Sequence, residues 1–254
     1  MDKQIDPHMM PFFLEGKTED DCVLIIHGFT GSPASVRPLA EFLNRKGNGF
    51  NVKCMLLPEH GTDMADLFRS RWKKWYSAGV SEFKELKKRF RNVHVIGFSM
   101  GGNIALCMAA SLDVAKLVTI STPILIKNKM AYFAEFLGLF RKYHYWWKST
   151  PLEGELTFDH PPGYPGMPVR SIAEVRKITI ASFNRLRRVK QPILISQSLK
   201  DKTVHPKSPY LIYDLTESSY KEFLLLHNAR HNAIISPDRE HLFKAIEAFL
   251  LKRP

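Results

Sequence analysis

The stretch "VHVIGFSMGGNIALC", residues 93–107, decides the fold. Residues 93–97 form a short strand-like run, and the apolar run that ends the stretch is typical of a helix. Between them lies the G-x-S-x-G sequence Gly97-Phe98-Ser99-Met100-Gly101. Small residues two positions before and after the serine permit a tight strand-to-helix turn, because larger side chains would collide there. The pattern predicts a nucleophile elbow with Ser99 as the nucleophile. The alternative is a glycine-rich turn that only allows close helix–sheet packing.

Strands and helices alternate along most of the chain, which is typical of a parallel sheet covered on both faces. Apolar runs predict strands at residues 22–26, 50–57, 93–97, 116–121, 192–198 and 222–227. Amphipathic patterns predict helices at 36–47 and 65–91, and a last helix that opens at Ser236 and Pro237. The predicted fold class is α/β, with a mainly parallel central sheet flanked by helices.

Residues 122–189 interrupt this alternation. They contain two amphipathic helical stretches, 129–147 and 171–188, on either side of a proline-rich loop. A long insertion between two strands of such a sheet is usually functional, so we predict a helical cap over a site. The predicted core then comprises 1–121 and 190–254. Aromatic residues spread around the first stretch, and either the second helix covers them or some of them line an acyl pocket.

A serine hydroxyl is a weak nucleophile, so it needs a base and an acid that orients the base. In this architecture the chain order is serine, acid, histidine. Asp201 follows the strand-like run 192–198, and sites form at the carboxyl ends of strands. Asp201 is therefore the predicted acid, whereas Asp214 and Asp238 are predicted to be turn residues.

Two histidines compete for the role of base. His227 ends the predicted strand 222–227, and His231 lies four residues later in the loop before the last helix. A residue within the loop can extend over the sheet edge to Ser99, so we favour His231. His227 is interpreted as a packing residue at the strand end.

The turn "HGFTG", residues 27–31, follows the first apolar strand. An acyl-transfer intermediate carries an oxyanion that needs two hydrogen-bond donors. The backbone amide of Met100, directly after the serine, is one candidate, and the amide of Phe29 in this turn is the other. His27 and Gly28 are predicted to shape the turn without taking part in proton transfer.

The chain of 254 residues carries 37 lysines and arginines against 25 acidic residues, a net charge of +12. The cations cluster at residues 69–74, 84–91 and 185–190, but no nucleic-acid-binding motif accompanies them, so no nucleic-acid partner is expected. The clusters are either solvated surface or a field that attracts anionic substrates or weakly associates with an anionic membrane surface.

Three cysteines, Cys22, Cys54 and Cys107, are far apart and lie in or beside apolar runs, which indicates buried thiols in a reducing compartment. No zinc-ligand spacing is present, and neither a metal ion nor an organic cofactor is implied. The N-terminal segment lacks the apolar core of a signal peptide, and no run approaches the ~18 apolar residues of a membrane span. We therefore expect a soluble, cytoplasmic protein, either monomeric or dimeric.

With these residues in hand, the chain resembles the α/β-hydrolases, and most closely the small bacterial carboxylesterases and monoacylglycerol lipases that carry a cap. The resemblance rests on "LIIHGFTGSPASVRPLAEFL", "LLPEHGTDMADL", "VIGFSMGG", "LVTISTPI" and "DKTVHPKSPYLIYD". It implies Ser99 as nucleophile, Asp201 as acid, His231 as base, and Phe29 and Met100 as oxyanion amides. Glu59 departs from the pattern because the family usually has glycine there, and Ala229-Arg230 stands where the family usually has Ser-Gly before the histidine.

The implied function is a serine hydrolase that cleaves small-molecule carboxylic esters with short- to medium-chain acyl groups through an acyl-enzyme intermediate. A thioesterase or acyltransferase would use the same three residues, and a non-catalytic basic binding protein is a further alternative. A serine, an acid and a histidine are all present as candidates, which argues against the non-catalytic binding protein.

Overall fold

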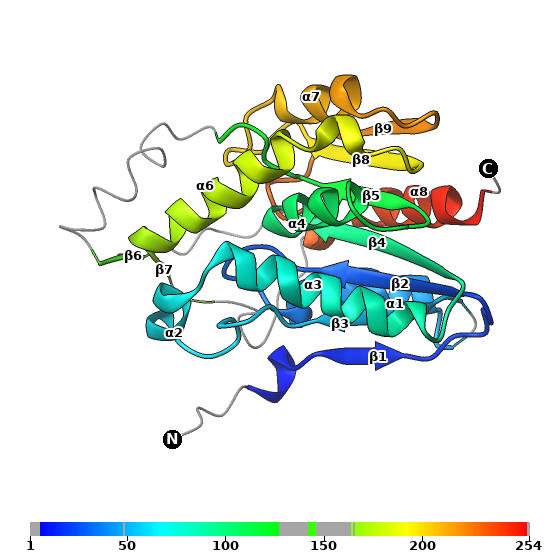
Figure 1. Ribbon diagram of the computed structural model, residues 1–254, viewed down its shortest axis with the longest axis horizontal. Coiled ribbons are helices and arrows are strands. Elements are labelled where there is room, and N and C mark those ends of the chain that lie inside the picture. The colour runs from blue at the N-terminus through cyan, green and yellow to red at the C-terminus, as the bar shows by residue number, and fades with distance from the viewer. Residues whose placement is uncertain (1–5, 48, 127–141, 146–163, 165, 253–254) are drawn as a thin grey trace.

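The computed structural model describes residues 6–47, 49–126, 142–145, 164 and 166–252. A seven-stranded sheet crosses the molecule in the order β1-β3-β2-β4-β5-β8-β9, and every neighbouring pair is parallel except β1 with β3 (Figure 1). Its strands are β1 (Phe12–Leu14), β2 (Asp21–Ile26), β3 (Asn51–Met55), β4 (Asn92–Phe98), β5 (Leu117–Ile120), β8 (Ile193–Ser198) and β9 (Lys221–Leu226). The fold class predicted from the sequence is confirmed.

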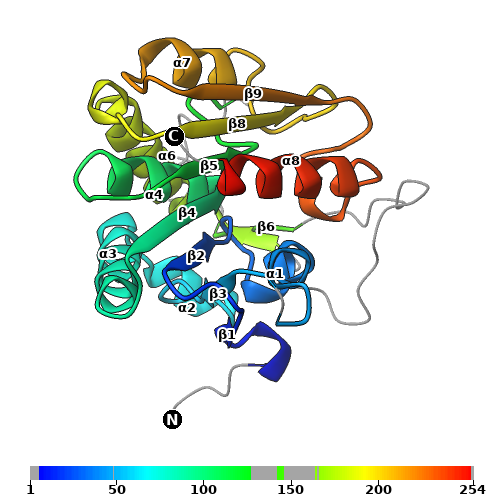
Figure 2. The same ribbon diagram turned by 90° about the vertical axis from the view of Figure 1, so that its right-hand side faces the viewer.

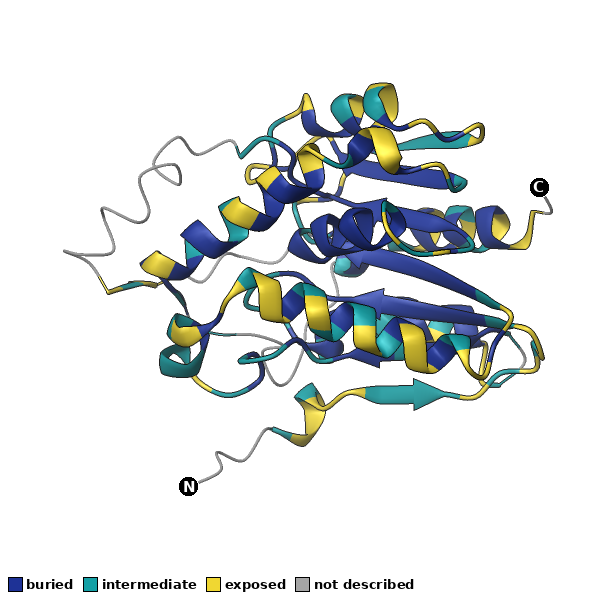
Figure 3. Cartoon of the chain, in the orientation of Figure 1, coloured by how far each residue is buried: buried dark blue, intermediate teal, exposed yellow. Residues whose placement is uncertain are grey.

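Helices cover both faces of this sheet, as Figure 2 shows. They are α1 (Arg37–Asn44), α2 (Met64–Arg69), α3 (Trp72–Lys87), α4 (Met100–Ala109), α6 (Val169–Phe183), α7 (Ser208–Leu215) and α8 (Arg239–Leu251). Leu24 and Ile26 of β2 pack into one core with α3, α4 and α6, whereas Val23 and Ile25 pack into the opposite core with α1 and α8. Both faces of β2 are therefore buried (Figure 3), which is why its sequence reads as an unbroken apolar run.

The edge strand β1 was not predicted. Phe12, Phe13 and Leu14 pair antiparallel with β3 and are only half-buried. Three residues are too few to show a strand period, so the pairing depends on the neighbouring strand rather than on the local sequence.

The predicted helix 65–91 is wrong in its continuity, because the structure has two helices there. The first, α2, begins after Asp63, whose side chain accepts hydrogen bonds from the amides of Ala65 and Asp66. Ser70 and Arg71 then adopt extended backbone conformations, and α3 begins at Trp72. The ends of two other predicted helices also differ from the prediction.

The helix predicted over 36–47 begins with a 3₁₀ turn at Pro33–Val36 and ends at Asn44, because Arg45 adopts a left-handed conformation with φ 48°. The last helix begins at Arg239, after a 3₁₀ turn at Ala233–Ile235, and not at Ser236.

Within the predicted cap, the second helical stretch forms α6 and a short 3₁₀ turn at Leu186–Arg188. Most of the predicted helix 129–147 lies outside the described residues. Its end is not helical, because Tyr143–Tyr145 forms strand β6 and pairs antiparallel with β7 (Gly166–Pro168). The cap boundaries 122 and 189 stay a prediction.

Hydrogen bonds from three side chains join residues 164–174 to residues 59–72. The hydroxyl of Tyr164 accepts from the Thr62 amide at 3.2 Å and donates to the Glu59 carbonyl at 3.3 Å. The Ser171 hydroxyl donates to the Leu67 carbonyl at 2.9 Å. Glu174 Oε2 accepts from the Trp72 amide at 3.1 Å and thereby caps α3 from another helix.

No helix in the described ranges is long and apolar enough to cross a membrane.

Candidate active site

Ser99 stands between the last residue of β4 and the first residue of α4. Its backbone has φ 53° and ψ −122°, a region that glycine tolerates and other residues rarely adopt. The Ser99 amide donates to the Ile120 carbonyl at 2.8 Å, and the Ser99 carbonyl accepts from the Gly102 amide at 2.9 Å. Backbone strain of this kind costs of order 1–3 kcal/mol and persists only where the surroundings impose it.

The two glycines of the motif are required by close backbone contacts. A Cβ atom on Gly97 would lie 2.4 Å from the Gly101 carbonyl oxygen, and one on Gly101 would lie 2.2 Å from the Ile26 carbonyl oxygen. Neither contact is possible without moving β2, β4 or α4. The strand, turn and helix therefore hold Ser99 in its strained conformation.

Ser99, His231 and Asp201 form a continuous chain of hydrogen bonds. His231 Nε2 lies 2.9 Å from Ser99 Oγ, and His231 Nδ1 lies 2.8 Å from Asp201 Oδ2. The three residues follow β4, β9 and β8, so three loops at the carboxyl end of the sheet converge here. The structure brings together the predicted nucleophile, base and acid.

Asp201 is buried, with 5% of its surface exposed, and its carboxylate is fully engaged. Oδ1 accepts from the Thr203 and Val204 amides at 2.7 and 3.0 Å, and Oδ2 also accepts from Gln197 Nε2 at 3.0 Å. Burial raises the pKa of Asp201, but the hydrogen bond from His231 and the backbone amides outweigh it, so the net pKa is lower than usual.

An ionised Asp201 accepts the Nδ1 proton of His231, which leaves the lone pair of Nε2 facing the Ser99 hydroxyl. The imidazole is thus oriented to accept the serine proton. This geometry favours the nucleophile interpretation of Ser99 over a turn that only packs, and the reactivity of Ser99 stays a prediction.

The competing candidates lie elsewhere. His227 is exposed just beyond β9, so the packing role expected for it is wrong. Asp214 is exposed within α7 rather than in a turn. Asp238 lies before α8 and accepts from the Asn228 and Ala229 amides at 2.6 and 3.2 Å, which shapes the loop that carries the candidate base.

The turn at residues 27–31 is organised by a buried histidine. The Leu57 amide donates to His27 Nε2 at 3.1 Å, so the ring proton is on Nδ1, which donates to the Gly28 carbonyl at 2.8 Å. The Gly28 carbonyl and the Phe29 amide belong to one planar peptide group, so this bond also sets the direction of the Phe29 N–H. Sequence reasoning assigned His27 to the turn but not this arrangement.

The turn passes close to the elbow, since a Cβ on Gly28 would lie 3.2 Å from the Ser99 Cβ. Met100 is the first residue of α4, and the first amides of a helix have no acceptor within it. The Phe29 amide likewise has no acceptor among the described residues. The two amides predicted as oxyanion donors are therefore uncommitted, and their role stays a prediction.

Glu59, which replaces the usual family glycine, has φ 60°. This value explains why glycine suits the position. Lys74 Nζ lies 2.7 Å from Glu59 Oε1, and the Tyr164 hydroxyl binds the Glu59 carbonyl. The loop thus keeps the left-handed conformation despite the substitution. His60, the next residue, is buried and contacts the rings of Phe29 and Trp75.

Comparisons with known proteins identify the family of the fold. Residues 21–161 match the family model of the alpha/beta hydrolase fold. The chain is 27% identical over 252 residues to a thermostable monoacylglycerol lipase of Bacillus sp. (strain H-257), with 95% of this chain and 94% of that protein covered. It is 22% identical over 243 residues to a carboxylesterase of Bacillus subtilis (strain 168), with 95% and 96% covered.

A solved structure described with LipS and LipT, two metagenome-derived lipolytic enzymes, superposes with a TM-score of 0.90 at 30% identity, over 98% of this chain and 100% of that one. The resemblance inferred from the sequence motifs is confirmed over the full length. The chain belongs to the α/β-hydrolase fold family, among its lipolytic and esterase members.

Proposed function

We propose that the protein is a serine hydrolase that cleaves carboxylic esters with short- to medium-chain acyl groups through an acyl-enzyme intermediate. The observation that carries the proposal is the hydrogen-bond chain from Asp201 through His231 to Ser99, with the serine on a strained turn. The lipolytic and esterase relatives support the same class of reaction.

In the first half of the reaction, Ser99 Oγ attacks the ester carbonyl carbon while His231 Nε2 takes the hydroxyl proton. The carbonyl oxygen becomes an oxyanion that accepts hydrogen bonds from the Phe29 and Met100 amides. The intermediate then collapses, the bond to the alcohol oxygen breaks, and His231 returns the proton to the leaving alcohol. An acyl group remains on Ser99.

In the second half, water takes the place of the alcohol. His231 removes a proton from the water as the oxygen attacks the acyl carbonyl, and then returns it to Ser99 Oγ as the acid leaves. Asp201 keeps the imidazole oriented and stabilises its charged form in both halves, which is consistent with its lowered pKa. His27 acts by holding the peptide group that carries the Phe29 amide.

The acyl-chain preference follows from burial of the chain in an apolar pocket. Each buried methylene contributes up to ~0.8 kcal/mol, so kcat/KM should rise severalfold for each added pair of carbons until the pocket is full. From the family resemblance we expect the optimum between about four and ten carbons. The cap aromatics assigned to this pocket, such as Phe136 and Trp146, lie outside the described residues.

The test is a series of p-nitrophenyl esters and monoacylglycerols of increasing acyl length, with Ser99→Ala as the control. We expect turnover that depends on Ser99 and passes through an optimum. Ester turnover retained by Ser99→Ala would overturn the proposal. Matched acyl thioesters are included, and a much larger kcat/KM for these would instead identify a thioesterase.

A further inference from the structure

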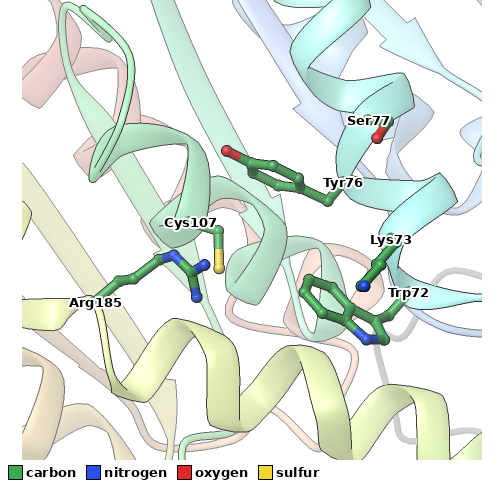
Figure 4. Close-up of a pocket in the computed structure, with 6 residues that line it drawn as sticks. All are labelled: Trp72, Lys73, Tyr76, Ser77, Cys107 and Arg185. Atoms are coloured by element: carbon green, nitrogen blue, oxygen red, sulfur yellow. The ribbon is translucent and has the colours of Figure 1, made fainter.

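We propose that a pocket between α3, α4 and Arg185, in the segment after α6, binds a small organic carboxylate, at a site separate from Ser99. The pocket has a volume of about 240 Å³. It is lined by Trp72, Lys73, Tyr76, Ser77, Cys107 and Arg185 (Figure 4). None of these residues takes part in the hydrogen-bond chain of the candidate active site.

The location follows from the helix geometry. Cys107 lies eight residues beyond Ser99 along α4, which corresponds to about 12 Å of helix. Trp72 and Tyr76 are four residues apart on α3 and so lie on the same side of that helix. In Figure 4 the guanidinium of Arg185 extends toward Cys107, with the ring of Tyr76 across the opening from it. The pocket therefore opens near the end of α4 that lies farther from Ser99.

The charge of the lining favours an anion. Neither Lys73 nor Arg185 has a carboxylate partner in the described part of the chain, and no acidic residue lines the pocket. Two other lysines of α3 are paired, Lys74 with Glu59 at 2.7 Å and Lys87 with Asp113 at 3.7 Å. Two unpaired cations thus face one pocket.

Arg185 is also held in place for binding. One of its terminal nitrogens, Nη1, donates to the Ala181 carbonyl at 2.8 Å, at the end of α6. That bond restrains the guanidinium and leaves its other N–H groups for a ligand. A planar guanidinium binds a carboxylate through two parallel hydrogen bonds, which suits this class of anion.

The walls require that the anion have an apolar body. The indole of Trp72, the ring of Tyr76 and the thiol of the nearly fully buried Cys107 offer apolar surface. Burial raises the pKa of Cys107 to about 11, so the thiol remains neutral and adds no negative charge. Phosphate or another inorganic anion would leave these walls uncovered. The volume lies below the range of ~300–1,000 Å³ typical of drug-sized ligands, so it suits a benzoate or a short-chain fatty acid.

The experiment titrates 4-fluorobenzoate into the full-length protein and follows the ¹⁹F linewidth. We expect Arg185→Gln to weaken binding by about tenfold or more, since it removes charged hydrogen bonds. Lys73→Gln, at an exposed position, should weaken binding by roughly threefold. Arg185→Lys should recover part of the affinity. The matched controls Arg187→Gln and Lys84→Gln, at exposed positions outside the lining, should leave it unchanged.

Two comparisons separate this site from the active site and from simple ion binding. Ser99→Ala should leave the affinity unchanged, and the neutral analogue 4-fluorobenzamide should bind at least about tenfold more weakly. The proposal is overturned by an absence of broadening, by affinity that the Arg185 and Lys73 substitutions do not change, or by competition from inorganic phosphate as strong as that from benzoate. Because Ser99 plays no part, the outcome is independent of the proposed esterase activity.

Discussion

Ser99 at 53° and Glu59 at 60° are two of the described residues other than glycine that stand at positive φ at the carboxyl end of the sheet, together with Thr30 and Ser121. The surroundings of Ser99 and Glu59 differ. Ser99 is confined by β4, α4 and the neighbouring β2 backbone, which lies too close to Gly101 for any side chain there. Glu59 lies in a loop, where an ion pair with Lys74 and a hydrogen bond from Tyr164 are its main restraints.

This difference shows that strain at the two positions has different origins. At Ser99 the packing of a whole strand–turn–helix unit imposes the conformation, so relaxing it would require the sheet to move. At Glu59 the conformation is a property of one loop, and glycine would adopt it without strain. We infer that a serine is kept at position 99 for its hydroxyl, whereas the glutamate at position 59 is tolerated.

The largest expected effect is that of Ser99→Ala. The substitution should lower kcat for ester hydrolysis by about 10⁶-fold, as expected when a nucleophile is removed. Stability should be nearly unchanged, because the elbow backbone and both glycines remain. Steady-state kinetics and urea denaturation measure the two quantities. Turnover within a few-fold of the unmodified protein would contradict the role of the elbow.

His231→Ala should lower kcat almost as much as Ser99→Ala, because the two groups act as a unit and their effects are not additive. The double variant should therefore be no slower than either single variant. His227→Ala is the matched control four residues earlier, and its exposed side chain predicts activity and stability near those of the unmodified protein. Activity lost in His227→Ala and retained in His231→Ala would show that His231 is not the base.

A smaller effect, on the pH dependence of stability, concerns two buried histidines, His27 in the turn after β2 and His60 next to Glu59. Burial lowers the pKa of His27 to about 3 and that of His60 to about 4, from 6.5 when exposed. Both are neutral in the folded protein but protonate on unfolding, so their contribution is complete above pH 6.5 and is lost as the pH falls. The free energy of unfolding should drop by roughly 2 kcal/mol per pH unit between pH 6 and 5.

Urea denaturation across this range measures that slope. The paired carboxylate of Asp201 does not contribute there, because its pKa is below 3.8. His60→Phe should roughly halve the slope. His241→Gln, at an exposed position of α8, should leave it unchanged. A slope unaffected by His60→Phe would mean that this histidine is accessible to protons in the folded state.

The smallest expected effect is that of Glu59→Gly. Relief of the left-handed conformation contributes about 1–2 kcal/mol, and the lost ion pair with Lys74 offsets up to ~1 kcal/mol of it. The net change in the free energy of unfolding should be stabilising by about 1 kcal/mol or less. Glu59→Ala, which keeps the strain and loses the ion pair, is the control and should destabilise. Equal destabilisation by both variants would show that the loop is not strained.

Much of this arrangement was predictable from the sequence for a physical reason. Strands buried on both faces, such as Val23–Ile26 within β2, read as unbroken apolar runs. The elbow is recognisable because the two glycines that it requires, Gly97 and Gly101, stand at fixed spacing around Ser99 in one short segment, although Gly101 is required by the backbone of β2. The order of serine, acid and histidine along the chain then selected Asp201 and His231, which the structure brings into hydrogen-bond contact with each other and with Ser99.

What could not be predicted depends on contacts between distant segments. The break between α2 and α3 is stabilised by Glu174, which caps Trp72 from a helix about a hundred residues later. Strand β6 exists through pairing with β7, although the sequence around Tyr143–Tyr145 is typical of a helix. The proton position on His27 depends on the Leu57 amide, which no local pattern reveals.

The most direct test of the central claim is covalent labelling of the native protein with a fluorophosphonate, followed by peptide mapping. We predict a single adduct on Ser99 that forms at a much lower rate in His231→Ala, because the base activates the serine. Ser32 and Ser121 are both buried and should remain unmodified. An adduct on either of these serines, or equal labelling of Ser99 without His231, would contradict the account.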